Sequence, residues 1–92
     1  MKIFRVVYDK AFIRQLKKYT KRLPSSDLTA LKRRLKVFQG NVFDARLETH
    51  KLKGSFTGYW SFSINYSDRI IFRFLNEGTV LFIDIDDHDI YR

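Results

Sequence analysis

The sequence contains no cysteine, only one proline and four glycines among its 92 residues. Without cysteine there is no disulfide framework and no thiolate chemistry, and a reducing compartment is the natural setting. No apolar run approaches the roughly 20 residues that cross a bilayer, and the charged Lys2 directly follows Met1. With no repeat, low-complexity tract or linker, we expect a single domain over 1–92 that is cytoplasmic and has no membrane partner.

Positive charge is what the chain has in excess, and it is concentrated in the first half. The formal net charge is +8, with twelve Lys and Arg against two acidic residues in 1–40, and six against eight in 41–92. A basic segment of this kind favours a polyanionic or acidic partner, although a basic surface kept only for solubility is the alternative. Nine Phe, five Tyr and one Trp supply the large side chains for a small core.

The first half of the chain predicts a strand followed by two amphipathic helices. The apolar, β-branched run over 3–8 is typical of a strand. Asp9 can cap a helix that Pro24 ends, and a second helix follows from Ser25 or Ser26 to Gly40–Asn41. Their apolar stripes are Phe12, Leu16, Tyr19 and Leu23 in the first helix and Leu28, Leu31, Leu35 and Phe38 in the second.

The second half predicts a sheet whose centre is the stretch 50–74. Apolar and polar residues alternate there, so that one face is apolar and the other is basic and polar. We expect strands at about 49–54, 58–66, 69–76 and 79–85, with tight turns at Ser67–Asp68 and at 76–78. The fold class is α+β, in the order βααβββ(β): an antiparallel β-sheet with an N-terminal strand and a two-helix hairpin packed on one face.

The polar face of this sheet is the first candidate site. Alternation places Arg69 and Arg73 on one face of a strand, and Lys51 and Lys53 lie just upstream. Guanidinium and ammonium groups on a rigid strand can hold a phosphate backbone and stabilise the charge of a phosphoryl transition state. The alternative is a solvated face on which Arg73 pairs with a carboxylate.

Two histidines are the second candidate. Imidazole suits the proton transfers of a metal-free ribonuclease, and His50 and His88 flank the predicted sheet, although an isolated surface histidine is more often a spectator. The acidic run of Asp84, Asp86, Asp87 and Asp89 could bind Mg²⁺, but we favour a role in which it partly neutralises nearby arginines or raises the pKa of His88. Because no Gly-rich phosphate loop, His-Glu-x-x-His or zinc-ligand spacing occurs, we expect no metal and no cofactor.

Several short motifs together resemble the RelE/ParE superfamily of toxins from type II toxin–antitoxin systems, most closely the YafQ-like and RelE-like mRNA interferases. They are Leu-Lys-Gly at 52–54, Gly-Tyr-Trp-Ser at 58–61, Asp-Arg-Ile-Ile-Phe-Arg at 68–73, and a terminal His followed three residues later by an aromatic. The likeness covers nearly the whole chain. It implies a ribosome-dependent, metal-independent endoribonuclease that cleaves mRNA to a 2′,3′-cyclic phosphate, and a cognate antitoxin as its partner.

The resemblance also implies roles for single residues. His88 matches a C-terminal general acid or base, His50 an acid/base position in the second strand, and Arg69 the arginine that contacts the scissile phosphate. Tyr91 matches an aromatic used for base stacking or proton transfer, and Lys53 a lysine that binds the RNA backbone. The expected catalytic set is therefore His88, Arg69, His50 and Tyr91, and the expected RNA-binding set is Lys51, Lys53 and Arg73.

The chain departs from the YafQ-like pattern at two positions. Ser63 stands where those enzymes have a further histidine, and Ser67 where they have an aspartate, although Asp68 is adjacent. Two other functions stay open: a ParE-like toxin that inhibits DNA gyrase without nuclease activity, and a catalytically decayed module that binds RNA or a partner. An antitoxin with an acidic, amphipathic segment would suit the basic face.

Overall fold

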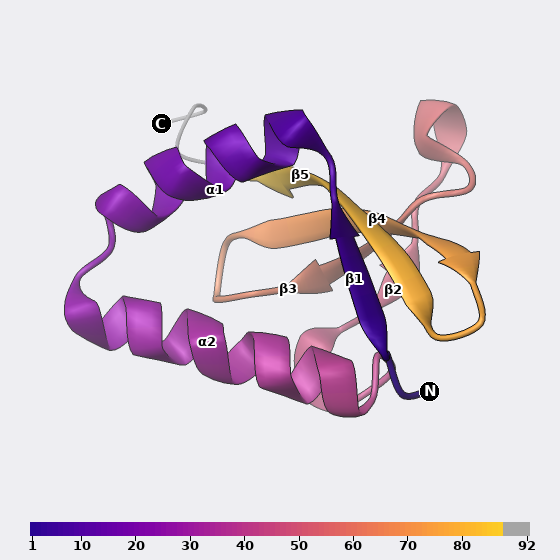
Figure 1. The fold of residues 1–92 in the computed structure, drawn as a ribbon, viewed down its shortest axis with the longest axis horizontal. Coiled ribbons are helices and arrows are strands. Elements are labelled where there is room, and N and C mark those ends of the chain that lie inside the picture. The colour runs from indigo at the N-terminus through magenta and orange to yellow at the C-terminus, as the bar shows by residue number, and fades with distance from the viewer. Residues whose placement is uncertain (88–92) are drawn as a thin grey trace.

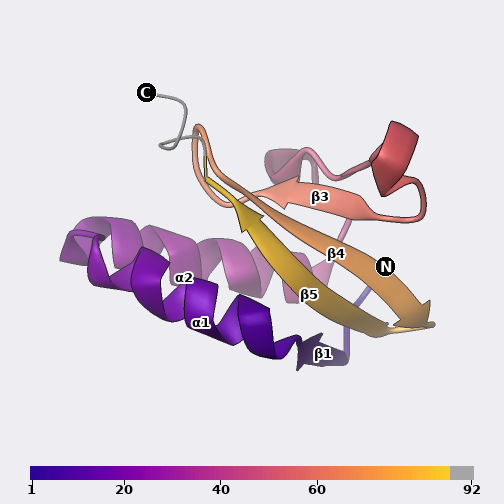
Figure 2. The same ribbon diagram turned by 90° about the horizontal axis from the view of Figure 1, so that it is seen from above.

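Two helices cover one face of a five-stranded sheet (Figure 1). The computed structural model describes residues 1–87. The elements are β1 (Arg5–Tyr8), α1 (Lys10–Lys21), α2 (Ser25–Gly40), η1 (Ala45–Leu47), β2 (His50–Lys51), η2 (Gly54–Phe56), β3 (Trp60–Ser63), β4 (Arg69–Asn76) and β5 (Thr79–Asp86), of which η1 and η2 are single 3-10 turns. The expected α+β architecture is confirmed, and Figure 2 shows both helices on the same side of the sheet.

The helix hairpin forms for the local reasons that its sequence indicates. The Asp9 carboxylate accepts a 2.7 Å hydrogen bond from the Ala11 N–H and caps α1. Pro24 occupies the N-cap of α2, where its missing N–H costs nothing. Each predicted stripe lies toward the core, and Phe12 and Phe38 are fully enclosed. Within residues 1–87 neither helix is long and apolar enough to cross a membrane.

The sheet has the strand order β1-β5-β4-β3-β2, and one of its four pairings is parallel. Strands β2 to β5 form the expected antiparallel meander, but β1 lies beside β5 in parallel register, from Arg5 opposite Thr79 to Tyr8 opposite Phe82. A short apolar run specifies a strand without specifying its neighbour or direction. The sheet is therefore mixed, and β1 adds to it at the edge.

Two predicted strands are shorter in the structure than their apolar patterns suggest. The second covers only His50–Lys51, because the chain turns into η2 at Gly54, which has a φ of +70°. The third ends at Ser63, because the side chain of Asn65 accepts hydrogen bonds from the N–H groups of Ser67 and Asp68 and forms a turn. Both changes place loops at the two ends of β3.

The core is an aromatic cluster between the helices and the sheet. The ring of Phe38 from α2 stacks on Phe62 of β3 at 4.3 Å and meets Phe72 and Phe82 edge-on. These rings come from the alternate positions of β3, β4 and β5 that face the helices. The residues between them, including Ser61, Arg69 and Asp84, consequently lie on the opposite face.

Candidate active site

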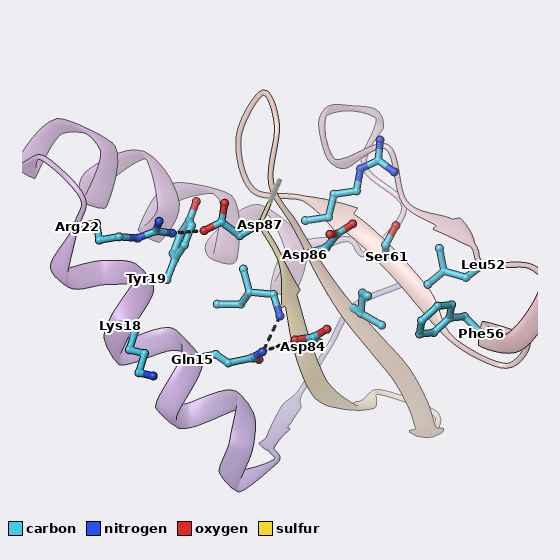
Figure 3. A pocket seen from close by; sticks show the side chains of 13 residues that line it. Gln15, Lys18, Tyr19, Arg22, Leu52, Phe56, Ser61, Asp84, Asp86 and Asp87 are labelled. Atoms are coloured by element: carbon cyan, nitrogen blue, oxygen red, sulfur yellow. Dashed lines mark hydrogen bonds and ion pairs between the residues drawn. The ribbon is translucent and has the colours of Figure 1, made fainter. Parts of the chain in front are cut away.

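A cleft of about 800 Å³ lies over the face of β3 to β5 that points away from the aromatic core, and it extends past the edge of β5 to α1. Strands β3 to β5 form its floor, α1 forms one wall, and Leu52 and Phe56 form the other (Figure 3). Its polar lining consists of Gln15, Lys18, Tyr19 and Arg22 from α1, Ser61 from β3, Arg69 from β4, and Asp84, Asp86 and Asp87 at the end of β5. Both signs of charge therefore meet within one concave site.

Strand pairing arranges the floor of the cleft in two rows. In the first row, His50 pairs with Ser61, Ser61 with Ile71, and Ile71 with Asp84. In the second row, Ser63 pairs with Arg69, and Arg69 with Asp86. The register thus puts His50 and Arg69, which are 19 positions apart in the chain, on the same face of the sheet.

Arg69 is half-buried on the floor of the cleft. Within residues 1–87 no side chain forms a hydrogen bond or ion pair with its guanidinium. A planar guanidinium with five N–H donors is matched to the oxygens of a phosphate, which it can bind through two parallel hydrogen bonds. Arg69 is placed to receive an anion that enters the cleft.

His50 stands at the rim of the cleft and is held from both ring nitrogens. Its Nδ1 lies 2.8 Å from the carbonyl oxygen of Glu48, and its Nε2 lies 3.5 Å from the hydroxyl of Ser61. The imidazole itself is exposed, whereas Ser61 is buried. The ring is thus open to solvent on its outer side and contacts a residue that lines the cleft.

The other predicted basic residues do not gather around Arg69 as one face. Lys51 pairs with Trp60 and points to the helical side of the sheet, where its ammonium lies 5.5 Å from the centre of the Trp60 ring. Lys53 is exposed in the connection before η2, and Arg73 is exposed farther along β4, outside the cleft. The predicted grouping of Lys51 with Arg69 and Arg73 is corrected. His50 shares the face of Arg69, and Lys51, the next residue of β2, therefore faces the opposite side.

Two carboxylates of the cleft, Asp84 and Asp87, are bound by residues of α1 and its C-cap. Gln15 donates a 2.5 Å hydrogen bond from Nε2 to Asp84 and accepts one from the backbone N–H of Ile85. The pairing of β1 with β5 ends at Phe82, so Gln15 binds the edge of β5 beyond that point. Arg22 forms an ion pair with Asp87. In the part of the chain that the structure describes, no group of acidic residues and histidine is arranged to hold a metal ion.

A buried polar network below the cleft was not predicted. The Tyr19 hydroxyl donates a 2.5 Å hydrogen bond to the carboxylate of Asp68, and Asn65 and Ser67 donate to the same carboxylate. Burial is the main reason that the pKa of Tyr19 is raised above its usual value, and the Asp68 charge adds to it. The sequence pattern assigned Tyr19 to an apolar stripe and Asp68 to a turn. The only available signal was that a buried tyrosine hydroxyl and a buried carboxylate each need a hydrogen-bond partner.

Two members of the predicted catalytic set, His88 and Tyr91, lie outside the described residues. Of the other two, Arg69 lines the cleft, whereas His50 is not among its lining residues and reaches its rim through the contact with Ser61. Asp87, the last described residue, lines the cleft beside α1.

The fold is similar to that of solved structures, although the sequence matches no known family. No family model matches the sequence, and no curated protein matches it. Among solved structures, a YoeB/ParE toxin from Agrobacterium tumefaciens superposes with a TM-score of 0.73 at 17% identity, covering 92% of this chain and 99% of that one. A YafQ variant from E. coli gives 0.72 at 20% identity, with 94% of each chain covered.

The chain has the fold of the YoeB/ParE and YafQ proteins. A chain of the heterotetrameric YoeB–YefM toxin–antitoxin complex from Staphylococcus aureus shares it as well, with a TM-score of 0.68 at 16% identity over 96% of this chain and 99% of that chain. The fold that the resemblance to the RelE/ParE superfamily implied is thereby confirmed.

Proposed function

We propose that this chain is the toxin of a type II toxin–antitoxin pair and acts as a ribosome-dependent endoribonuclease. The ribose 2′-hydroxyl of the message would attack the neighbouring phosphorus, the 5′-oxygen would leave, and a 2′,3′-cyclic phosphate would remain. Such a reaction needs one group that accepts a proton, one that donates a proton, and a cation that stabilises the charge growing on the phosphate. In this proposal His50 and His88 would handle the two protons, and Arg69 would be the cation.

The observation that carries this proposal is the Arg69 guanidinium in the cleft, without a protein partner among residues 1–87. An arginine on the floor of a concave site lies in surroundings less polar than water, which strengthens its attraction for a phosphate. Because it is held on a strand, its position needs little rearrangement when substrate arrives. Arg69 would bind the scissile phosphate and stabilise it as negative charge accumulates.

His50 would contact the same phosphate as Arg69. The two residues are two strands apart and one row apart on the same face, which corresponds to roughly 12 Å between their Cα atoms for ordinary sheet spacing. Their side chains both extend above that face, so a nucleotide between them could contact both. His88 would handle the second proton, and Tyr91 would stack on a base, as the family resemblance implies.

The three carboxylates that line the cleft within residues 1–87 could repel RNA, and two of them are offset by neighbouring side chains. Asp84 is bound by Gln15, and Asp87 by Arg22. Lys18 adds a positive charge on the same wall. Beyond the cleft, Lys53, Arg73 and the basic helices would contact the backbones of messenger and ribosomal RNA, an interaction that weakens as salt is raised.

The partner that silences the activity would be an antitoxin with an acidic, amphipathic segment. The basic residues of α1 and α2 offer the complementary charge, since residues 1–40 carry twelve Lys and Arg against two acidic residues. A segment of this kind could fold as it binds, as the partners of such basic surfaces often do.

Addition of the purified protein to a cell-free translation extract tests the proposal. We expect protein synthesis to stop and the message to be cut within codons, with cyclic phosphate at the new 3′ ends. Intact messages in a fully inhibited or unaffected extract would contradict it. Intact messages together with gyrase-trapped DNA in cells would identify the ParE-like alternative instead.

A further inference from the structure

The setting of the His50 ring defines which of its nitrogens can exchange a proton. The carbonyl oxygen of Glu48 lies 2.8 Å from Nδ1. A carbonyl oxygen only accepts hydrogen bonds, so Nδ1 must carry a hydrogen in both the neutral and the protonated ring. Nε2 is then the nitrogen that gains and loses the second proton.

The backbone around Glu48 is held firmly in the position that this contact requires. Glu48 has a φ of +51°, the left-handed conformation, and is the only non-glycine residue of 1–87 with a positive φ. Its neighbours anchor it, because Leu47 is completely buried and the Thr49 hydroxyl donates a 2.5 Å hydrogen bond to the carbonyl oxygen of Val42. A costly backbone conformation fixed from both sides aims the Glu48 carbonyl at the histidine.

Ser61 contacts the other nitrogen of the same ring, Nε2. Only 1% of Ser61 is exposed, and within residues 1–87 its hydroxyl has no hydrogen-bond partner except Nε2 of His50, at 3.5 Å. A buried hydroxyl needs a partner, and this one can donate to a bare Nε2 or accept from a protonated one. Ser61 also lines the cleft, so its contact with Nε2 brings that nitrogen to the edge of the site where substrate would bind.

We propose that His50 rests as the Nδ1–H tautomer, exchanges protons only through Nε2, and is aligned there by Ser61, a positioning residue. This inference rests on the proposed function for its chemical meaning. A neutral ring with Nε2 bare toward the cleft is a proton acceptor. The 2′-hydroxyl proton would pass to Nε2 as the bond from the 2′-oxygen to phosphorus forms, and the departing 5′-oxygen would take its proton from a different acid.

Long-range ¹H–¹⁵N correlation spectra of the imidazole rings test the tautomer without any need for nuclease activity. A His88→Gln variant assigns the His50 signals. With the ring neutral, we expect the shift of an unprotonated nitrogen at Nε2 and that of a protonated nitrogen at Nδ1. Free histidine favours the opposite tautomer, so a spectrum with hydrogen on Nε2 would overturn the inference.

A matched pair of serines tests the positioning role. Ser61 and Ser63 are both buried on the same face of β3, but no hydrogen bond involving the Ser63 hydroxyl is found within 1–87. We expect the Nε2 resonance of His50 to move in Ser61→Ala, to return toward its wild-type position in Ser61→Thr, and to stay in place in Ser63→Ala. Equal shifts in the two alanine variants, or no shift in either, would refute a role for Ser61.

Cleavage rates then connect the arrangement to the proposed reaction. Under single-turnover conditions, we expect Ser61→Ala to slow cleavage roughly tenfold, as loss of a supporting hydrogen bond to a functional group commonly does. In a His50→Ala background the same change should have no further effect, because the positioned group is absent. Fully additive effects would contradict the inference. If wild-type protein cuts no message, the proposed function fails, while the spectra still decide the tautomer.

Discussion

The hydroxyl of Tyr19 in α1 donates a 2.5 Å hydrogen bond to the carboxylate of Asp68, the residue that precedes Arg69. Asp68 is only 7% exposed, and Asn65 and Ser67 supply its other hydrogen bonds. The ring of Tyr19 also lies under the Arg22 guanidinium, which pairs with Asp87. One buried side chain therefore connects α1 to the residue before β4 directly and, through Arg22, to the residue after β5.

Replacement of Tyr19 by phenylalanine should destabilise the protein. The change removes one donor from a buried carboxylate, and such a loss typically costs about 1–3 kcal/mol. Urea denaturation measures the difference. Tyr66→Phe is the matched control, because Tyr66 is fully exposed and its hydroxyl makes no hydrogen bond within residues 1–87. Equal stabilities for the two variants would show that the buried network contributes nothing.

The same tyrosine gives stability a pH dependence at high pH. Burial raises the pKa of Tyr19 in the folded protein, so the unfolded chain loses this proton first as the pH rises. The stabilisation is complete below the unfolded pKa of about 10 and declines above it. The difference in unfolding free energy between wild type and Tyr19→Phe should thus shrink above about pH 10. A difference that stays constant or grows would contradict this assignment.

The turn between β4 and β5 depends on Gly78. Its φ is +80°, and a Cβ at this position would lie 2.8 Å from Cδ2 of Phe4. We expect Gly78→Ala to destabilise the protein by about 1–3 kcal/mol, as strained backbone conformations commonly do. Thermal unfolding measures the effect. Gly40→Ala is the control and should cause no loss, since Gly40 lies in α2 and a Cβ there meets no atom within 4 Å.

Much of the fold could be predicted because its signals are local. The cap at Asp9, the apolar stripes of both helices, and the hairpin turn at Gly78 depend on residues a few positions apart, and the structure confirms each. The parallel pairing of β1 with β5 could not be predicted. The paired residues of β1 and β5 are more than 70 positions apart in the chain. A short apolar run does not specify which strand it will pair with.

The site was less predictable, for a related reason. Alternation along β4 places Arg69 on the polar face, but the two-residue length of β2 and its register decide that His50 joins this face while Lys51 turns away. Neither the left-handed backbone of Glu48 nor the contact between Tyr19 and Asp68 has a local sequence signal. Long-range register and loop conformation, not composition, assemble the cleft.

The rate at which Arg69→Ala cleaves ribosome-bound message tests the central claim most directly. Cleavage should be measured in a single turnover with saturating protein, beside wild type and Arg5→Ala, which removes the same charge from the far edge of the sheet. Loss of a group that stabilises transition-state charge should slow cleavage by roughly 100-fold or more, while Arg5→Ala should match wild type. If Arg69→Ala cuts the message as fast as wild type does, Arg69 is not the group that stabilises the phosphate, and this account of the site is wrong.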